Sequence, residues 1–180
     1  MRVISGKARG VTLKTPDGLK TRPTADRVKE AMFSIIQFDL PGATVLDLFG
    51  GTGQLGIEAL SRGANKAIFV DQDRTACNLI RENLQRTKLH EQAQVVQSDY
   101  STYLRACRNK FNVILLDPPY AEEFLENSLK IITEIDILQS GGIIVCERPV
   151  EKGFDCTFEG YFRSRDYKYG NTILAVFRKE

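Results

Sequence analysis

Short apolar runs alternate with longer amphipathic segments along most of this chain, and that alternation restricts its fold more than any other feature. The runs at 44–47, 67–70, 94–97, 111–116 and 143–146 are rich in apolar and β-branched residues and predict strands. Between them, apolar residues recur at helical spacing. Strands separated by helices of this length form βαβ units. We therefore expect an α/β fold with a parallel sheet covered on both faces.

The C-terminal end has a different pattern. Residues 158–166 and 172–177 are rich in β-forming residues, and only the segment 167–171 separates them. A parallel crossover needs about a dozen residues or more, so these strands should form an antiparallel hairpin. We predict a Rossmann-like mixed sheet of seven strands, parallel in its body and antiparallel at its C-terminal end. The 180 residues contain no linker or repeat that would divide them.

Positive charge is concentrated at the N-terminal end. The first 30 residues contain eight Lys or Arg against three Asp or Glu, whereas the remaining 150 contain 17 against 20. Strand-like pieces at 2–4 and 11–14 flank a turn-like segment, which predicts a hairpin with Lys7 and Arg9 at its tip. Such a basic end could be a docking surface for a polyanion, or it could be an ordinary solvated hairpin at the surface. Charge alone does not choose between these two interpretations.

We predict a basic hairpin extension over residues 1–23 and a main domain over 24–180. Thr24 is a plausible N-cap for the first helix. The apolar residues of that helix recur at helical spacing, at Val28, Met32, Ile35 and Ile36.

The cysteines and the single histidine do not form a metal-binding pattern. Cys77, Cys107, Cys146 and Cys156 include no CxxC pair, and His90 has no partner histidine. The N-terminus lacks the apolar segment of a signal peptide, and no run reaches transmembrane length. We expect a cytoplasmic protein with no metal site, no disulfide and no membrane contact, in which Cys146 is a small core residue.

A glycine-rich loop follows the first predicted strand of the sheet. Residues 51–56 satisfy GxGxxG, in which glycines let a ligand approach the backbone where a strand meets its helix. NAD and S-adenosylmethionine both use such a loop. Asp47, which ends the strand, favours S-adenosylmethionine, because its carboxylate would attract the ammonium group of the methionine part and repel a pyrophosphate.

Acidic residues also end the next two strands. Asp71 lies 20 residues after Gly51 and suits the ribose hydroxyls, while Ser98 and Asp99 suit the adenine amino group. Either aspartate alone is equally well explained as a turn cap. Three acidic strand ends beside a glycine loop are much harder to explain in that way. The predicted cofactor-binding residues are Asp47, Phe49, Gly50, Gly51, Gly53, Asp71, Gln72, Ser98, Asp99 and Tyr100.

The sequence Asp117-Pro-Pro-Tyr120 follows the buried strand predicted at 111–116. Two prolines hold the chain extended and remove two backbone donors. The strand end then presents two acceptors, the Asp117 carboxylate and the Pro118 carbonyl, beside an aromatic ring. This edge suits a planar group that carries an NH₂, although alone it is also compatible with an ordinary strand-ending turn. The predicted catalytic residues are Asp117, Pro118, Pro119 and Tyr120, with Tyr120 stacking on a base.

Together these motifs resemble class I S-adenosylmethionine-dependent methyltransferases that act on amino nitrogens. They occur in the order DLFGGTG at 47–53, Asp71, Ser98-Asp99 and DPPY at 117–120. The N-terminal motifs are more specific and resemble the RsmD family of 16S rRNA guanine-N2 methyltransferases over essentially the whole chain. They are RVISGK at 2–7, Arg9-Gly10, LKTP at 13–16 and TRPTADRVKEAMF at 21–33.

The resemblance implies a class I fold, S-adenosylmethionine as donor with S-adenosylhomocysteine as product, and a guanine of 16S rRNA as acceptor, in an assembled or assembling small ribosomal subunit. A carboxylate fits the N1–H and N2–H₂ donors of guanine, yet DPPY also occurs in adenine-N6 enzymes. A cytosine-N4 or glutamine methyltransferase, an NAD-dependent oxidoreductase and a silent RNA-binding protein are further alternatives. The residues expected to contact RNA are Arg2, Lys7, Arg9, Arg22 and Arg27.

Glu147 ends the strand that follows the DPPY motif. Its position is compatible with two roles, facing the site or capping a turn, and the sequence does not decide between them.

Overall fold

The computed structural model describes residues 1–16, 23–119, 123–151 and 156–180, with only the backbone of 23–25. Two of the predicted site residues, Arg22 and Tyr120, lie outside this range.

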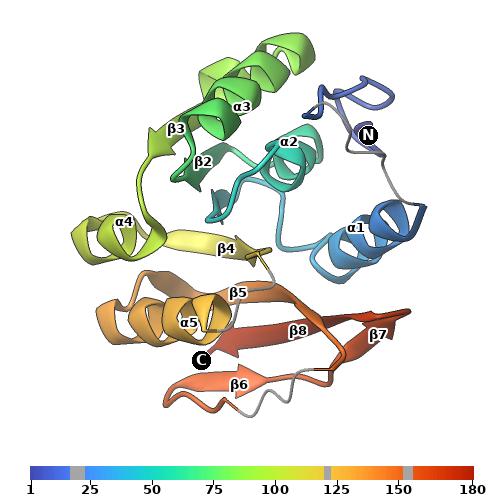
Figure 1. Ribbon diagram of the computed structural model, residues 1–180. Coiled ribbons are helices and arrows are strands. Elements are labelled where there is room, and N and C mark those ends of the chain that lie inside the picture. Colours follow the sequence, from blue (N-terminus) through green and yellow to red (C-terminus); the bar gives the residue numbers. More distant parts are fainter. Residues whose placement is uncertain (17–22, 120–122, 152–155) are drawn as a thin grey trace.

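One mixed sheet runs through the molecule in the order β3-β2-β1-β4-β5-β8-β6, and β7 also pairs with β8 (Figure 1). The parallel strands are β1 Thr44–Asp47, β2 Lys66–Asp71, β3 Ala93–Gln97, β4 Phe111–Leu116 and β5 Leu138–Pro149. The antiparallel strands are β6 Tyr161–Arg163, β7 Tyr167–Tyr169 and β8 Thr172–Lys179. The structure thus confirms the predicted parallel body and antiparallel end. The strands are added outward from β1 to β3 on one side, and the order then reverses, so that β4 pairs with the other side of β1.

The described part of the sheet has eight strands where seven were predicted, because β7 lies in the predicted connection at 167–171, while only β6 forms within the segment expected as one strand at 158–166. Arg148 and Arg163 both form ion pairs with Asp166, at 2.7 and 3.0 Å, and this contact lies between β6 and β7. β7 then turns sharply into β8, with Tyr169 paired to Thr172. The predicted connection at 167–171 is therefore partly strand.

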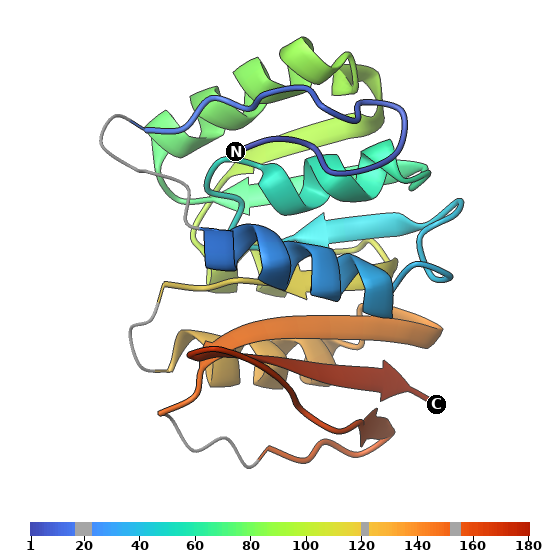
Figure 2. The ribbon, with the colours of Figure 1, turned by 90° about the vertical axis from the view of Figure 1, so that its right-hand side faces the viewer.

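Helices cover both faces of the sheet, as Figures 1 and 2 show. One face carries α1 Pro23–Ile35, α2 Gln54–Ser61 and α3 Arg74–Thr87, and the other carries α4 Tyr100–Ala106 and α5 Phe124–Ile135. A short 3₁₀ helix, His90–Gln92, precedes β3. Each face has its own buried apolar core, and Cys146 lies in the core under α4 and α5, as predicted. Every helix in the described ranges is too short or too polar to span a bilayer.

The first helix begins at Pro23, so the expected cap Thr24 lies inside its first turn. Val28, Met32 and Ile36 are buried as the helical spacing predicts.

The N-terminal segment lies across α2 and α3 and shares their core (Figure 2). Its two arms run antiparallel, with Val3 N donating to Val11 O at 3.0 Å, but the predicted hairpin is reduced to a single bridge between Arg2 and Thr12. Most of its polar contacts are instead with α2 and α3. The buried Glu58 carboxylate accepts from the backbone N–H groups of Ile4 and Ser5, at 2.8 and 3.0 Å.

The turn of this segment rests against the C-terminal end of α2. Lys7 N donates to Ser61 O at 2.8 Å, and a Cβ added at Gly6 would lie 1.8 Å from the same oxygen. Gly6 has a φ of +86°, whereas Gly10, with a φ of +84°, has no atom within 4 Å of such a Cβ. A side chain substituted at either glycine would therefore meet the same backbone strain, but only at Gly6 would it also meet a close contact.

Gly6→Ala should destabilise the protein more than Gly10→Ala, because only the first adds a clash with Ser61 to the strain. We expect Gly10→Ala to cost about 1–2 kcal/mol of unfolding free energy and Gly6→Ala roughly 1–3 kcal/mol more. Urea unfolding of both variants measures the difference. Equal losses would show that the turn is not held against α2 as described.

Candidate active site

A cavity of about 740 Å³ opens where the parallel strands end, at the reversal between β1 and β4. Open parallel sheets bind ligands at this point, and the volume is typical of small-molecule sites. Most of the predicted site residues line it: Asp47, Phe49, Gly50, Gly51, Asp71, Gln72, Ser98, Tyr100, Asp117, Pro118 and Pro119. Gly53 and Asp99 are not among its lining residues.

Four carboxyl groups reach the cavity from four neighbouring strands, because side chains at alternate positions of a strand share one face. The residue two positions before each acid belongs to the core under α1, α2 and α3, so the acids continue that face. These core residues are Val45, Phe69, Leu115 and Val145, and the acids are Asp47, Asp71, Asp117 and Glu147. Such a cavity attracts a cation and repels a pyrophosphate.

Asp47 is buried and only half satisfied. Its Oδ2 accepts from Gly56 N at 2.9 Å, while its Oδ1 has no hydrogen-bond partner among the described residues. Burial raises the pKa of Asp47 to about 7, and the charges of Asp117 and Asp71 add to that shift. An ammonium group in the cavity would satisfy Oδ1 and favour the ionised form. The residue therefore fits the cation-binding role predicted for it.

The Asp71 carboxylate is held in one orientation by the backbone. Its Oδ2 accepts from Gly51 N at 2.8 Å and its Oδ1 from Asp73 N at 2.9 Å. This links the glycine loop to the start of α3. Each oxygen retains a lone pair, so the carboxylate can still accept from a ligand hydroxyl.

The two predicted cofactor-binding residues that do not line the cavity shape the elements beside it. Gly53 is the N-cap of α2 in the left-handed region, with a φ of +79°. The Asp99 carboxylate caps α4, accepting from the N–H groups of Ser101 and Thr102 at 3.0 and 3.1 Å. The Asp99 side chain thus makes the capping contacts that the sequence allowed, and its role toward a cofactor stays a prediction, while the adjacent Ser98 lines the cavity.

Asp117 and Glu147 leave adjacent strands side by side. The register pairs Leu116 of β4 with Cys146 of β5, and the acids are the next residue on each strand. Burial raises the pKa of Asp117 to about 6. Burial also raises the pKa of Glu147 to about 8, and the negative charge of Asp117 adds to this shift.

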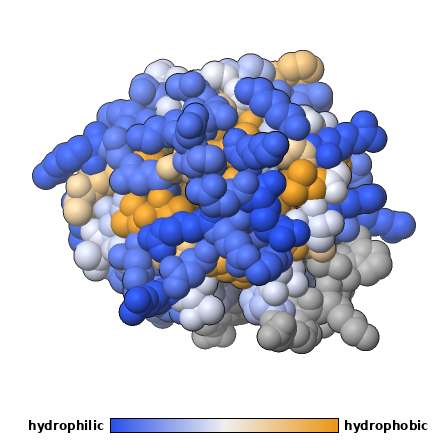
Figure 3. All heavy atoms as spheres, turned by 90° about the horizontal axis from the view of Figure 1, so that it is seen from above, coloured by the Kyte–Doolittle hydropathy of each residue, from blue (hydrophilic) through white to orange (hydrophobic). Residues whose placement is uncertain are grey.

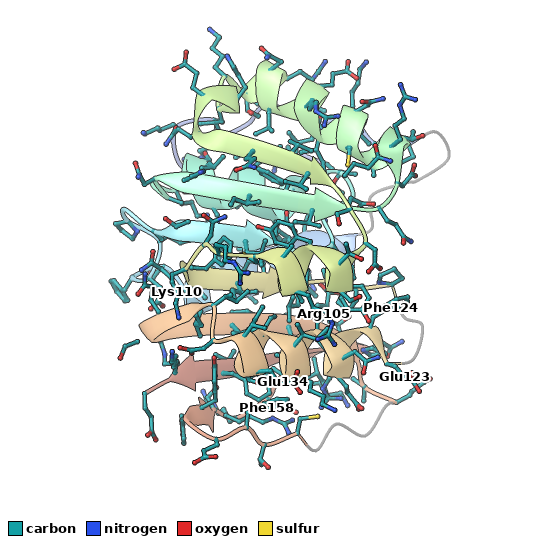
Figure 4. All side chains as sticks on the ribbon, turned by 90° about the vertical axis from the view of Figure 1, so that its left-hand side faces the viewer. Arg105, Lys110, Glu123, Phe124, Glu134 and Phe158 are labelled. Carbon is teal, nitrogen blue, oxygen red and sulfur yellow. The ribbon has the colours of Figure 1, made fainter. Side chains whose placement is uncertain are left out.

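Phe124 and Lys29 are among the cavity residues that were not predicted as site residues. Phe124 of α5 packs against Phe49 and Tyr100, with ring centroids 6.2 and 5.5 Å away. Figure 4 shows it at the same edge at which the parallel strands end. Its apolar spacing in the sequence indicated only a core position.

Lys29 is the second such residue and is only 2% exposed. Its Nζ donates to Arg2 O at 2.8 Å and lies 3.6 Å from Glu58. Burial lowers its pKa. The sole sequence signal was a lysine next to the buried stripe of α1, which did not distinguish it from a surface residue.

The predicted RNA-binding residues that the structure describes, Arg2, Lys7, Arg9 and Arg27, are all exposed. They do not form one group. Lys7 and Arg9 lie at the C-terminal end of α2, one helix length of about 12 Å from the cavity at its N-terminal end. Arg2 is nearer, since its carbonyl binds Lys29. The face that carries α3 and the N-terminal segment is largely hydrophilic (Figure 3).

The pH dependence of folding should report on Asp47. Between the ordinary pKa of 3.8 and the folded value of about 7, the folded state keeps a proton that the unfolded state has released. Stability should therefore fall as the pH rises through this range. Asp47→Asn should remove that contribution and stabilise the ligand-free protein above pH 7 by roughly 1–3 kcal/mol, less the cost of an unpaired amide.

Urea unfolding at pH 5 and pH 8 checks this result. Asp136→Asn is the control, because its carboxylate is exposed and paired with Lys110 and Lys179. A pH dependence in Asp47→Asn identical to that of the unmodified protein would show that Asp47 is already ionised when folded.

Comparison with known proteins places the chain in a family. The family model described as "Conserved hypothetical protein 95" matches residues 1–178 of this sequence. "Putative rRNA methyltransferase YlbH" of Bacillus subtilis is 42% identical over 99% of both chains. "Ribosomal RNA small subunit methyltransferase D" of Escherichia coli K12 is 31% identical over all of this chain and 90% of its own length.

A solved structure agrees with this placement. "Putative methyltransferase yhhF from Escherichia coli" has a TM-score of 0.90 and 30% identity, and the match covers 100% of this chain and 98% of the other. The chain therefore has the class I methyltransferase fold and belongs to the RsmD family.

Proposed function

We propose that this protein transfers a methyl group from S-adenosylmethionine to the exocyclic N2 of a guanine in 16S rRNA. The observation that carries the proposal is the convergence of Asp47, Asp71 and the Asp117-Pro118 edge on one cavity. It brings together a carboxylate for a cation, a carboxylate that accepts from hydroxyl groups and a pair of acceptors for an amine. The names of the relatives, which specify methylation of ribosomal RNA and of its small subunit, support the choice of substrate.

The β1 and β2 side of the cavity fits the cofactor. Bound there, S-adenosylmethionine supplies a methyl group activated by its positively charged sulfur. Asp47 Oδ1 accepts from the ammonium group, and Asp71 accepts from the ribose hydroxyls. Phe49 and Tyr100 offer aromatic surface to the adenine ring. The four carboxyl groups of the cavity make a dinucleotide pyrophosphate a poor alternative ligand.

The β4 side of the cavity fits the acceptor. The lone pair of an aromatic amine is delocalised into its ring, which makes the nitrogen a weak nucleophile. Asp117 and the Pro118 carbonyl accept from its two N–H bonds and so favour a tetrahedral nitrogen, with the lone pair aimed at the methyl carbon. The proton released after transfer goes to Asp117 or to water, because the amine then carries a positive charge and needs no strong base.

The basic residues of the N-terminal end supply the RNA contacts in this proposal. Arg2 lies near the cavity through the contact of its carbonyl with Lys29, and Lys7 and Arg9 extend the positive surface away from it. A surface that reaches beyond the active site suits a folded RNA, and we expect an assembled or assembling small subunit in the cytoplasm as the substrate.

Asp117→Asn should lower the rate of methyl transfer by about 100-fold or more, because an NH₂ donor replaces one of the two oxygens of the carboxylate that accepts from the amine. Affinity for S-adenosylhomocysteine should change little. The assay uses labelled cofactor and small subunits from cells that lack the protein, with free 16S rRNA and DNA as controls. Nucleoside analysis distinguishes N2-methylguanosine from N6-methyladenosine, and calorimetry measures cofactor and NAD binding.

Asp136→Asn serves as the matched control, since Asp136 caps the C-terminal end of α5, whereas the N-terminal end of that helix borders the cavity. Full activity in Asp117→Asn, or a product other than N2-methylguanosine, would contradict the proposal.

Replacing both Lys7 and Arg9 by Ala should weaken RNA binding without changing the rate of methyl transfer at saturating RNA. The double-logarithmic dependence of affinity on salt should flatten by about 0.7–0.9 for each phosphate that the variant no longer neutralises. Lys110→Ala is the control, because Figure 4 shows Lys110 at the edge opposite to Phe124. An unchanged affinity and salt slope would remove Lys7 and Arg9 from the RNA surface.

A further inference from the structure

We propose that Glu147 selects the base by accepting a hydrogen bond from N1–H of the target guanine, beside the amine held by Asp117 and Pro118. This inference rests on the proposed function and extends it, since it assigns base choice to a residue outside the DPPY motif.

The geometry places Glu147 where the ring edge of the base must lie. The pairing of Leu116 with Cys146 carries Asp117 and Glu147 out of the sheet as neighbours. Both line the same cavity, and both continue the face that Leu115 and Val145 present to the core. In guanine N1 is separated from N2 by a single carbon atom, so a base whose amine contacts Asp117 turns its N1 edge toward an adjacent strand end.

Glu147 is half-buried and has no structural partner that would account for an acid at this position. Its backbone pairs with Leu174 of β8, but no side-chain hydrogen bond or ion pair to it is found among the described residues. Even partial burial of a carboxyl without a partner is costly, and such groups in a cavity mark functional positions. The role of a turn cap, which the sequence left open, is not the one observed, because Glu147 lies within β5.

The chemistry of the pair matches guanine. Asp117 and the Pro118 carbonyl accept the two N2 hydrogens, and Glu147 accepts the third donor, N1–H. Adenine and cytosine instead have an acceptor nitrogen next to the amino group, which an ionised Glu147 repels. N–H donors also favour the ionised form of the carboxyl, whereas an acceptor at that position requires it to keep its proton.

2-Aminopurine provides the discriminating probe, because it keeps the 2-amino group of guanine but has an acceptor at N1. Two forms of 16S rRNA are assembled into subunits. One has guanine and the other 2-aminopurine at the nucleotide that the unmodified protein methylates. Single-turnover methyl transfer is measured on both forms over a pH range from below to just above the Glu147 pKa of about 8, where guanine keeps its N1 proton. We expect the unmodified protein to prefer guanine by about 100-fold or more, and Glu147→Gln to reduce that preference to about tenfold or less.

Two further variants test the reason for the change. Glu147→Asp keeps an acceptor and should retain the preference at a lower rate. Glu134→Gln removes an exposed glutamate of α5 (Figure 4) and should change neither rate nor preference. S-adenosylhomocysteine binding confirms that each variant is folded.

The outcomes separate the two proposals. If the unmodified protein methylates guanine and Glu147→Gln keeps the full preference, the role of Glu147 is overturned and the proposed function stands. If the unmodified protein transfers no methyl group to either RNA, the proposed function fails and the inference fails with it. Equal rates on both bases in the unmodified protein also overturn the inference.

Discussion

The concentration of four carboxyl groups at one edge of the sheet is the constraint on which the rest of the site depends. Burial disfavours the ionised forms of Asp47, Asp117 and Glu147 and raises their pKa values, and repulsion by neighbouring carboxylates adds to the shift of Asp47 and Glu147. The parallel register fixes these groups on a rigid scaffold, so they cannot move apart to relieve the repulsion. The ligand-free cavity therefore favours any ligand that brings positive charge or N–H donors, and disfavours anions.

The N-terminal segment belongs to this construction and is more than a surface extension. The buried Glu58 binds its backbone near Ile4 and Ser5, while Asn83 of α3 binds both Lys14 and Thr52 of the glycine loop. Met1 and Lys29 then reach the cavity itself. The motifs that carry the family resemblance thus combine two roles, since they fix the segment to α2 and α3 and complete one wall of the cavity.

The sequence predicted the elements whose cause is local or periodic. Alternating strands and helices gave the parallel body, and strand-end aspartates gave most of the cavity. The prediction was less accurate at the C-terminal end, where the expected sixth strand is shortened to β6 and the expected connection contains β7; there Asp166 is paired with Arg148 of the distant β5, a contact that sequence spacing does not report. Phe124 and Lys29 were missed because apolar spacing and charge do not report which cavity a side chain faces. For Asp99, sequence spacing did not separate a ligand from a helix cap.

The register also orders the two halves of the cavity in depth. Asp47 pairs with Leu115, so Asp117 lies two residues, or about 6.6 Å, further along the strand direction. Asp47 is 1% exposed, whereas Asp117 is only partly buried. Under the proposed function, a cofactor held by Asp47 would lie deep, and a base held by Asp117 and Glu147 would lie at the rim. This order would let a small cofactor fill the interior while a large RNA presents one extruded base from outside.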